Sequence, residues 1–131
     1  FGTQINATFV SGGDVDIDRD DTTRQFILPG LGDSSNFSFF YEDSFVTARV
    51  ALNTRGETVA GFGNYDQPLY VEERNQWDLS LALNVAEDAV VFYEVQNVND
   101  EPTRLYARYQ EMLFLSQDHG PIHRLGFRYK F

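Results

Sequence analysis

The chain ends with the strictly alternating stretch Arg124-Leu125-Gly126-Phe127-Arg128-Tyr129-Lys130-Phe131. Successive side chains of a β-strand point to opposite faces, so one face of this strand carries only apolar residues. The opposite face is basic apart from Gly126, and the pattern closes on the aromatic Phe131 with no polar tail. This combination is typical of a wall with hydrocarbon on one side and water on the other. The stretch therefore predicts a strand of a membrane barrel.

Composition excludes several classes of protein. A chain of 131 residues can form one domain, and it contains no apolar run long enough for a transmembrane helix. The net charge of −10 argues against a nucleic-acid partner. The absence of cysteine excludes disulfides and thiolate metal sites. The chain opens in strand pattern, Phe1-Gly2-Thr3-Gln4, without a signal peptide, so we expect the natural N-terminus to lie elsewhere.

Six segments alternate well enough to predict strands. They lie at about 2–10, 35–42, 45–54, 76–85, 89–98 and 124–131. Most come close to the roughly 9–11 residues that a tilted strand needs to cross a bilayer. Phe40 and Phe92 interrupt the alternation by standing on the polar face of their strands. The high aromatic content, 15%, also favours strands over helices.

The predicted connections alternate between short and long. Two are tight turns, Glu42-Asp43-Ser44 and Ala86-Glu87-Asp88, and three are long loops, at about 11–34, 55–75 and 99–120. In an up-and-down meander, all short turns then lie at one end and all long loops at the other. Outer-membrane barrels have this asymmetry, with short periplasmic turns and long extracellular loops.

Acidic residues are concentrated in the predicted loops. Of the 20 acidic residues, only Asp78 and Glu94 fall within predicted strands, both on the polar face, and four lie in the two turns. The other fourteen lie in the long loops: Asp14, Asp16, Asp18, Asp20, Asp21, Asp33, Glu57, Asp66, Glu72, Glu73, Asp100, Glu101, Glu111 and Asp118. The same pattern also describes a soluble, secreted or periplasmic β-sandwich or barrel that binds through acidic loops. Alternation alone cannot separate the two possibilities.

A resemblance to a known family favours the membrane interpretation. The segments Asp78–Leu83, Asn97-Val98-Asn99-Asp100-Glu101-Pro102 and Gly120–Phe131 are similar to the C-terminal end of TonB-dependent outer-membrane receptors. In that family the corresponding patterns read DLSLSY, NLTDEP and GRxYxLGxRYKF. The hairpin Asn36–Val50 resembles another recurrent hairpin of the family, so the likeness covers nearly the whole chain. Val98 and the pair Pro121-Ile122 depart from the family pattern.

The resemblance implies an all-β antiparallel meander of about six strands within a larger transmembrane barrel of about 22 strands. Residues 1–131 would be the C-terminal part of a transporter that takes up a scarce, bulky ligand such as a siderophore, cobalamin or carbohydrate. Such a protein is not an enzyme and has no cofactor. It lies in the Gram-negative outer membrane, with TonB bound by an N-terminal region outside this chain. With two open sheet edges, the isolated segment is expected to self-associate or to curl into a locally closed sheet.

Three groups of candidate site residues follow from the resemblance and the strand pattern. Arg124, Gly126, Tyr129 and Phe131 match the C-terminal signal by which the barrel-assembly machinery recognises outer-membrane proteins. Arg49, Asp78, Glu94, Arg124 and Arg128 lie on the predicted lumen-facing side, where they are candidates for a polar ladder. Tyr65, Tyr70 and Trp77 are predicted at the loop rim, as an interfacial aromatic girdle or as ligand contacts.

Metal and catalytic motifs are weak. Asp14, Asp16 and Asp18 have the spacing of a calcium loop, but the glycine and glutamate that an EF-hand needs are replaced by Arg19 and Phe26. His119 and His123 are four residues apart, yet no third zinc ligand is near in sequence. No nucleophile elbow accompanies the serine, histidine and aspartate residues. We therefore predict no metal centre and no catalytic site.

Overall fold

The computed structural model describes residues 2–10, 17–21, 23–27 and 29–131. In this part of the chain the regular structure is β-strand, apart from a single 3-10 turn, η1 (Asn64–Asp66). No helix in the same residues is long and apolar enough to cross a membrane. The all-β prediction is confirmed.

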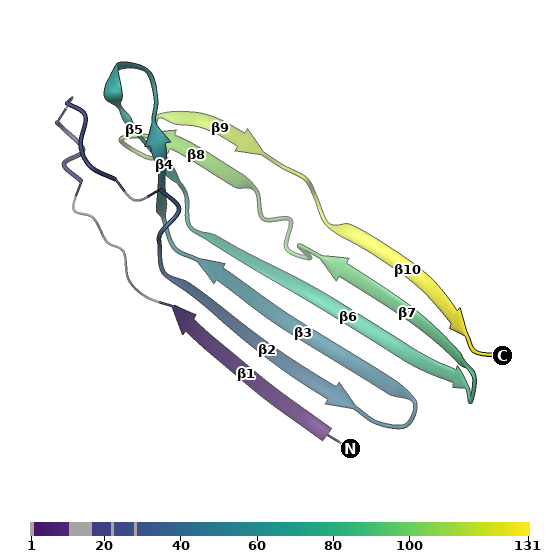
Figure 1. Ribbon diagram of the computed structural model, residues 1–131. Helices are drawn as coiled ribbons and strands as arrows, with labels where there is room; N and C mark the ends of the chain where they lie inside the picture. Colours follow the sequence, from purple (N-terminus) through teal and green to yellow (C-terminus); the bar gives the residue numbers. More distant parts are fainter. Residues whose placement is uncertain (1, 11–16, 22, 28) are drawn as a thin grey trace.

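Six long strands form one antiparallel sheet in the order β1-β2-β3-β6-β7-β10 (Figure 1). Their bounds are β1 (Gly2–Val10), β2 (Ser34–Glu42), β3 (Val46–Arg55), β6 (Arg74–Ala86), β7 (Ala89–Gln96) and β10 (Ile122–Tyr129). Each strand pairs with the next of these strands along the chain, so the sheet is an up-and-down meander. All six predicted strands are present. The fifth ends earlier than predicted, at Gln96, and the sixth begins earlier, at Ile122.

Four shorter strands form a second antiparallel sheet in the order β4-β5-β8-β9. Their bounds are β4 (Thr58–Phe62), β5 (Pro68–Val71), β8 (Thr103–Ala107) and β9 (Leu113–Gln117). This sheet lies at the end of the molecule opposite the two tight turns (Figure 1). The two long connections predicted at 55–75 and 99–120 therefore contain strands that the sequence did not indicate. These strands have four or five residues, and bulges at Val59/Gly61 and Leu105/Tyr106 interrupt the alternation that would reveal them.

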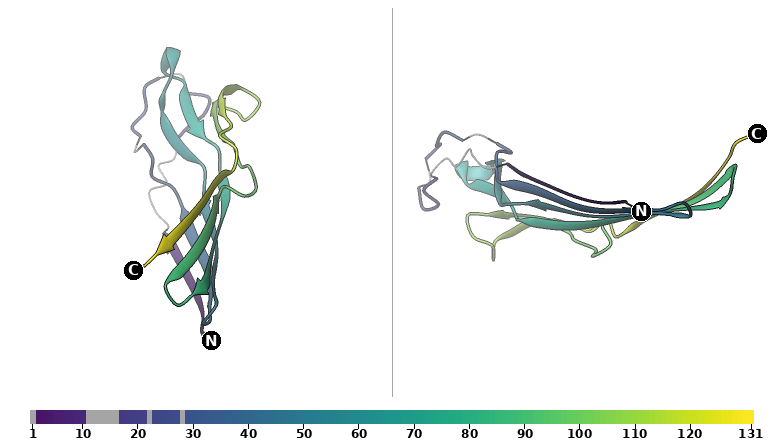
Figure 2. Two further views of the ribbon diagram at one scale, coloured as in Figure 1. Left: turned by 90° about the vertical axis from the view of Figure 1, so that its right-hand side faces the viewer. Right: turned by 90° about the horizontal axis from the view of Figure 1, so that it is seen from below.

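The six-stranded sheet is a single curved layer, and no second layer formed by the described residues packs on it (Figure 2). Contacts between strands follow the hydrogen-bonded neighbours of each sheet. β1 and β10 form the two edges and do not pair with each other. The locally closed sheet that the sequence left open as an alternative is therefore not formed, whereas self-association stays a prediction.

The tight turn between β2 and β3 is closed by the carboxylate of Asp43. Its Oδ1 accepts hydrogen bonds from the backbone N–H groups of Phe45 at 2.7 Å and Val46 at 3.0 Å. Asp and Asn side chains stabilise turns by replacing backbone acceptors in this way. Between β6 and β7 the pairing shifts near Asn84/Ala86, and the Asn84 side chain donates to the Ser44 carbonyl at 3.0 Å. The two turns are thereby tied to each other.

Candidate functional site

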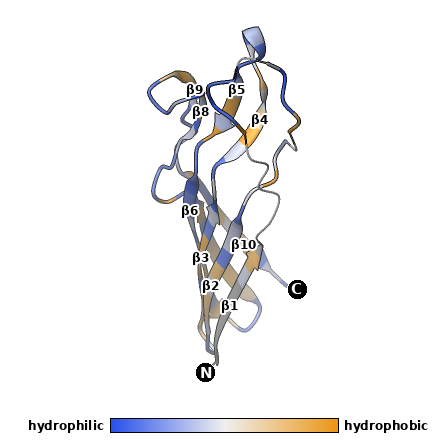
Figure 3. Ribbon diagram, turned by 90° about the vertical axis from the view of Figure 1, so that its left-hand side faces the viewer, coloured by the Kyte–Doolittle hydropathy of each residue, from blue (hydrophilic) through white to orange (hydrophobic). Residues whose placement is uncertain are grey.

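The six-stranded sheet has one continuous apolar face. The register places Phe39, Val50, Leu79 and Val95 in one row across the sheet, and Tyr41, Ala48, Leu81, Tyr93 and Leu125 in the next. A further row, Phe37, Leu52 and Trp77, lies nearer the second sheet, and the row Val46, Leu83, Val91 and Phe127 lies nearer the turns. Hydrophobic and hydrophilic residues alternate along β2 and β3, as the sequence predicts (Figure 3).

Large side chains on this face remain exposed. Leu125 is 76% exposed and Phe127 is 63% exposed, and Phe37, Phe39 and Trp77 are also exposed. The buried residues of the six strands, among those whose side chains are described, are no larger than valine: Ser38, Ala51, Ala89 and Val95. A soluble sheet normally buries its largest apolar side chains. The apolar face therefore lacks the cover that a water-soluble fold would give it.

The opposite, polar face is organised around Asp78. Its two carboxylate oxygens accept hydrogen bonds from the side chains of Asn53 at 2.9 Å and Gln76 at 2.8 Å, and from the backbone N–H of Asn97 at 3.0 Å. Asn53 in turn accepts a hydrogen bond from the Asn36 side chain. This chain of contacts crosses β2, β3 and β6 and fixes the polar side chains in one arrangement.

Two rows of the polar face contain the other predicted lumen-facing residues. Arg49, Ser80, Glu94 and Arg124 share one row, whereas Arg128 pairs with Val90 farther toward the turns. Arg49, Asp78 and Glu94 also border a hollow of about 300 Å³. The ion pairs within the described residues join Arg19 to Glu57 and Arg104 to Glu72. The strand register therefore places Arg49, Glu94 and Arg124 of the predicted polar ladder in one row. Neither of these ion pairs lies within the ladder.

The segment Asn97–Glu101 extends the pairing of β6 past the end of β7. The Asn99 side chain accepts from the Trp77 backbone N–H at 3.0 Å and donates to the Asn75 carbonyl at 2.7 Å. The Val98 N–H donates to the Trp77 carbonyl at 2.8 Å. Asn97, which has φ of 58°, binds Glu101 N–H through its side-chain oxygen at 2.9 Å. The segment that contains Asn97 and Asn99 thus takes the place of a neighbouring strand beside the first residues of β6.

In β10, Gly126 leaves room for an aromatic ring. Gly126 pairs with Phe92, and a Cβ built at Gly126 would lie 2.0 Å from Cζ of that ring. The ring of Phe92 therefore lies over Gly126 on the polar face, which explains why Phe92 breaks the alternation of β7. The other predicted signal residues, Arg124, Tyr129 and Phe131, are exposed along the edge strand and its end.

The three candidate ligand contacts lie in different environments. Tyr65 is fully displayed at the tip between β4 and β5, with φ of 61°. Trp77 lies on the apolar face, where it is half-exposed. Tyr70 is buried in the second sheet, where it stacks on Tyr106 with ring centroids 5.4 Å apart. The structure does not bring these three residues together, and Tyr70 is not accessible to a ligand.

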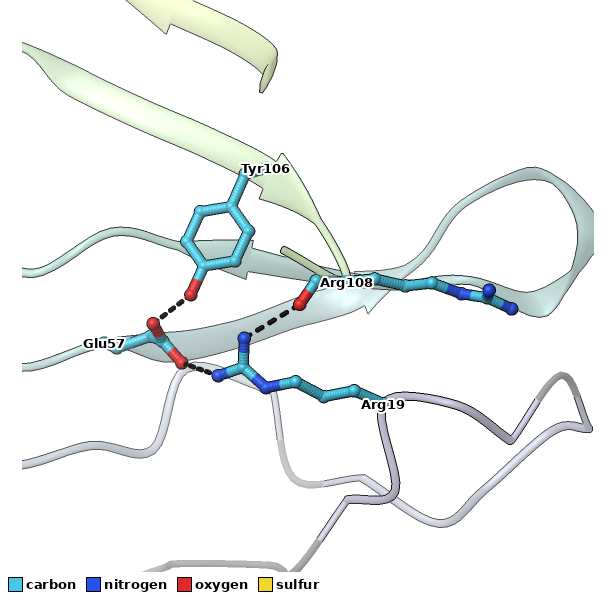
Figure 4. A network of polar contacts seen from close by, with 4 residues as sticks. All are labelled: Arg19, Glu57, Tyr106 and Arg108. Atoms are coloured by element: carbon cyan, nitrogen blue, oxygen red, sulfur yellow. Dashed lines mark hydrogen bonds and ion pairs between the residues drawn. The ribbon is translucent and has the colours of Figure 1, made fainter. Parts of the chain in front are cut away.

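A polar junction that the sequence did not predict ties residues 17–21 to the second sheet (Figure 4). The Arg19 guanidinium donates to Glu57 Oε1 at 2.7 Å and to the Arg108 carbonyl at 2.8 Å. It also lies over the Tyr70 ring, 4.4 Å from the centroid. Glu57 accepts a further hydrogen bond from the Tyr106 hydroxyl. These partners are far apart in sequence, so no local pattern could have indicated the junction.

Burial changes the chemistry of the tyrosines in this junction. Burial, together with the hydrogen bond to the Glu57 carboxylate, raises the pKa of Tyr106 to about 12. Burial also raises the pKa of Tyr70. Both hydroxyls therefore stay protonated at neutral pH, and the Tyr106 hydroxyl remains a donor to Glu57.

The described residues contain no cluster of three or more His, Asp or Glu side chains that could hold a metal ion. Asp14 and Asp16, which with Asp18 have the spacing of a calcium loop, lie outside the described residues. The Asp18 carboxylate accepts a hydrogen bond from the Asp20 backbone N–H at 2.9 Å. Nδ1 of His123 lies 2.8 Å from the Tyr93 hydroxyl and is hydrogen-bonded to it. His119 lies in the connection between β9 and β10.

Comparisons of the chain with protein-family models, with curated proteins and with solved structures found no match. An exposed apolar face, a hydrogen-bonded polar face and a second sheet at one end are the three features that a function has to explain.

Proposed function

We propose that this chain is part of the wall of an outer-membrane transport barrel of the TonB-dependent receptor kind. The six-stranded sheet would cross the membrane, with its apolar face toward lipid and its polar face toward the lumen. The second sheet would lie outside the cell, and the turns at Asp43 and Glu87 would face the periplasm. Further strands would pair with the open edges of β1 and β10 to close the barrel.

One observation carries this proposal. The same six strands expose large apolar side chains on one face and bind polar side chains to each other on the opposite face. Surroundings that are apolar on one side and wet on the other satisfy both faces at once. The Asp78 network and the hollow beside Arg49 and Glu94 would then border a water-filled passage. The proposed transport function needs no catalytic residue, because energy would come from TonB.

Cell fractionation and growth experiments test the proposal with the full-length gene. We expect the protein in the outer-membrane fraction, and we expect a deletion strain to lose growth on one scarce ligand when that ligand is limiting. Siderophores, cobalamin and oligosaccharides are the classes to screen. Growth should return with the wild-type gene, and short-term uptake of that ligand should stop when the inner-membrane proton gradient is dissipated.

A variant that lacks Phe131 provides a second readout. If the C-terminal signal is used in assembly, this deletion should lower the amount of protein in the outer membrane. Recovery of the wild-type protein in the soluble periplasmic or secreted fraction would contradict the proposal and favour a soluble binding module. Uptake that does not depend on the proton gradient would contradict the TonB-dependent mechanism.

A further inference from the structure

A hollow of about 330 Å³ lies directly beyond the last apolar row of the six-stranded sheet. Four of its lining residues, Phe9, Ser35, Thr54 and Asn75, form a single row across β1, β2, β3 and β6. On β2, β3 and β6 this row is two residues, or about 7 Å, from Phe37, Leu52 and Trp77. Because side chains two residues apart share a face, the hollow opens on the apolar side of the sheet.

The hollow is lined by groups that bind hydroxyls. Ser35 and Thr54 are hydrogen-bonded to each other through their hydroxyl groups, and Asn75 adds an exposed amide. Arg55 also lines the hollow, and its guanidinium is anchored by the Gly30 carbonyl at 3.1 Å. Hydroxyls and an amide offer both donors and acceptors within one small space.

An aromatic side chain and two carboxylates complete the lining. Phe9 is 80% exposed, so its ring is available as a flat apolar wall. Glu73 contributes carboxylate oxygens, which accept hydrogen bonds from hydroxyl groups, and Asp33 also lines the hollow. The carboxylate of Glu73 makes the hollow unfavourable for a phosphate. A neutral, hydroxyl-rich group with an apolar ring face fits this set of side chains.

We propose that the hollow binds the saccharide headgroup of a glycolipid. The sugar would occupy the polar hollow beside Phe9, and its hydrocarbon chains would lie along the apolar rows of Phe37, Leu52 and Trp77. This inference rests on the proposed function, because that function places lipid against the apolar face. The occupant must be amphipathic, since a polar hollow and an exposed apolar surface meet without a gap.

The test uses the full-length protein, purified in a polyoxyethylene detergent that carries no sugar. Native mass spectrometry would follow the binding of diglucosyl-diacylglycerol, diacylglycerol and phosphatidylglycerol. We expect diglucosyl-diacylglycerol to bind about tenfold more tightly than the other two lipids, as loss of a few hydrogen bonds implies. The double variant Thr54→Val/Asn75→Leu should lose this preference. The matched variant Thr47→Val/Asn64→Leu, with both changes outside the hollow, should keep it.

The outcomes separate this inference from the proposed function. Outer-membrane location with equal binding of all three lipids, or with a preference that survives Thr54→Val/Asn75→Leu, would refute the glycolipid site alone. Preferred binding of phosphatidylglycerol would do the same. Full competition by methyl glucoside at the concentration of the glycolipid would show that free sugar suffices, and would refute a lipid ligand. A wild-type protein outside the membrane fraction would refute both proposals.

Discussion

In the six-stranded sheet the large side chains of Leu125 and Phe127 are mostly exposed, whereas in the four-stranded sheet Tyr70 and Tyr106 are buried and stacked. At β5 and β8 the second sheet follows the rule of proteins in water, because the rings of Tyr70 and Tyr106 are removed from solvent and the Tyr106 hydroxyl is hydrogen-bonded to Glu57, although β9 remains exposed. The first sheet departs from that rule, because large apolar side chains on β2, β6 and β10 remain exposed. One chain therefore contains two regions suited to different surroundings.

The boundary between the two regions crosses β3 and β6 near their ends at Arg55 and Arg74. On one side of it, the rows of the outward face are apolar, ending with Leu52 and Trp77. On the other side they become polar at Thr54 and Asn75. Under the proposed function, a change of solvent along the strand would account for this switch, since neither the backbone pairing nor the strand direction changes there.

A charge on the apolar face tests the comparison most strongly. For Leu125→Arg we expect the free energy of unfolding of the full-length protein in lipid vesicles to fall by about 2–4 kcal/mol. The matched change Gln96→Arg, at an exposed position on the polar face, should cost less than about 0.5 kcal/mol. Urea unfolding measures both. Because Leu125 is already exposed, a cost as small as that of Gln96→Arg would mean that its face meets water.

Gly126→Ala should have the next largest effect. The added Cβ would enter the ring of Phe92, with distances of 2.0 Å to Cζ and 2.5 Å to Cε2. Overpacking of this kind costs about 1–3 kcal/mol, measurable as a lower urea midpoint and less assembled protein. Adding Phe92→Leu should restore both quantities. If the double variant regains stability in urea but not its level in the outer membrane, Gly126 is read by the assembly machinery itself.

The strand faces and the two tight turns were predictable because a period of two residues is visible over eight or more positions. The same period identified Phe92 as an apolar residue on the polar face. Why an aromatic ring stands there became clear only from the strand register, which places Phe92 opposite Gly126. β4, β5, β8 and β9 were missed because four or five residues with a bulge leave too little alternation to detect. In these cases the information lies in pairing rather than in local pattern.

The junction at Arg19 could not be predicted for a related reason. Its partners Glu57 and Arg108 are 38 and 89 residues away in sequence, and each is unremarkable among many charged loop residues. By contrast, Asp78 was recognised as a rare acidic residue within a strand, although its three donors became evident only with the fold. Sequence thus indicates the unusual residue, whereas the fold supplies its partners.

Arg19→Ala tests whether the second sheet depends on the chain segment that covers it. The Arg19–Glu57 pair is 37% and 33% exposed, so it contributes only about 0.2–1 kcal/mol, and the contact with the Tyr70 ring adds about 0.5–1 kcal/mol. We expect faster hydrogen exchange in β5 and β8, with no change in β3 or β6. Arg19→Lys should also lose protection, because an ammonium cannot keep both hydrogen bonds while lying on the ring. Faster exchange throughout the six-stranded sheet would show that the two regions are coupled.

High pH gives the smallest effect, and it should act on the second sheet alone. The pKa of Tyr106 is about 12 in the folded protein, above the ordinary tyrosine value of about 10. A raised pKa means that its contribution to stability is complete below about pH 10 and is lost as the pH rises toward 12.

Absorbance at 295 nm should therefore show a late tyrosine titration step that disappears in Tyr106→Phe and persists in the exposed-site control Tyr65→Phe. The protection of β8 against hydrogen exchange should fall over the same range of pH. The protection of β3 should not change, because β3 contributes no residue to the junction of Arg19, Glu57 and Tyr106. A late step that survives Tyr106→Phe would assign the titration to another tyrosine and break the link between Glu57 and the buried hydroxyl.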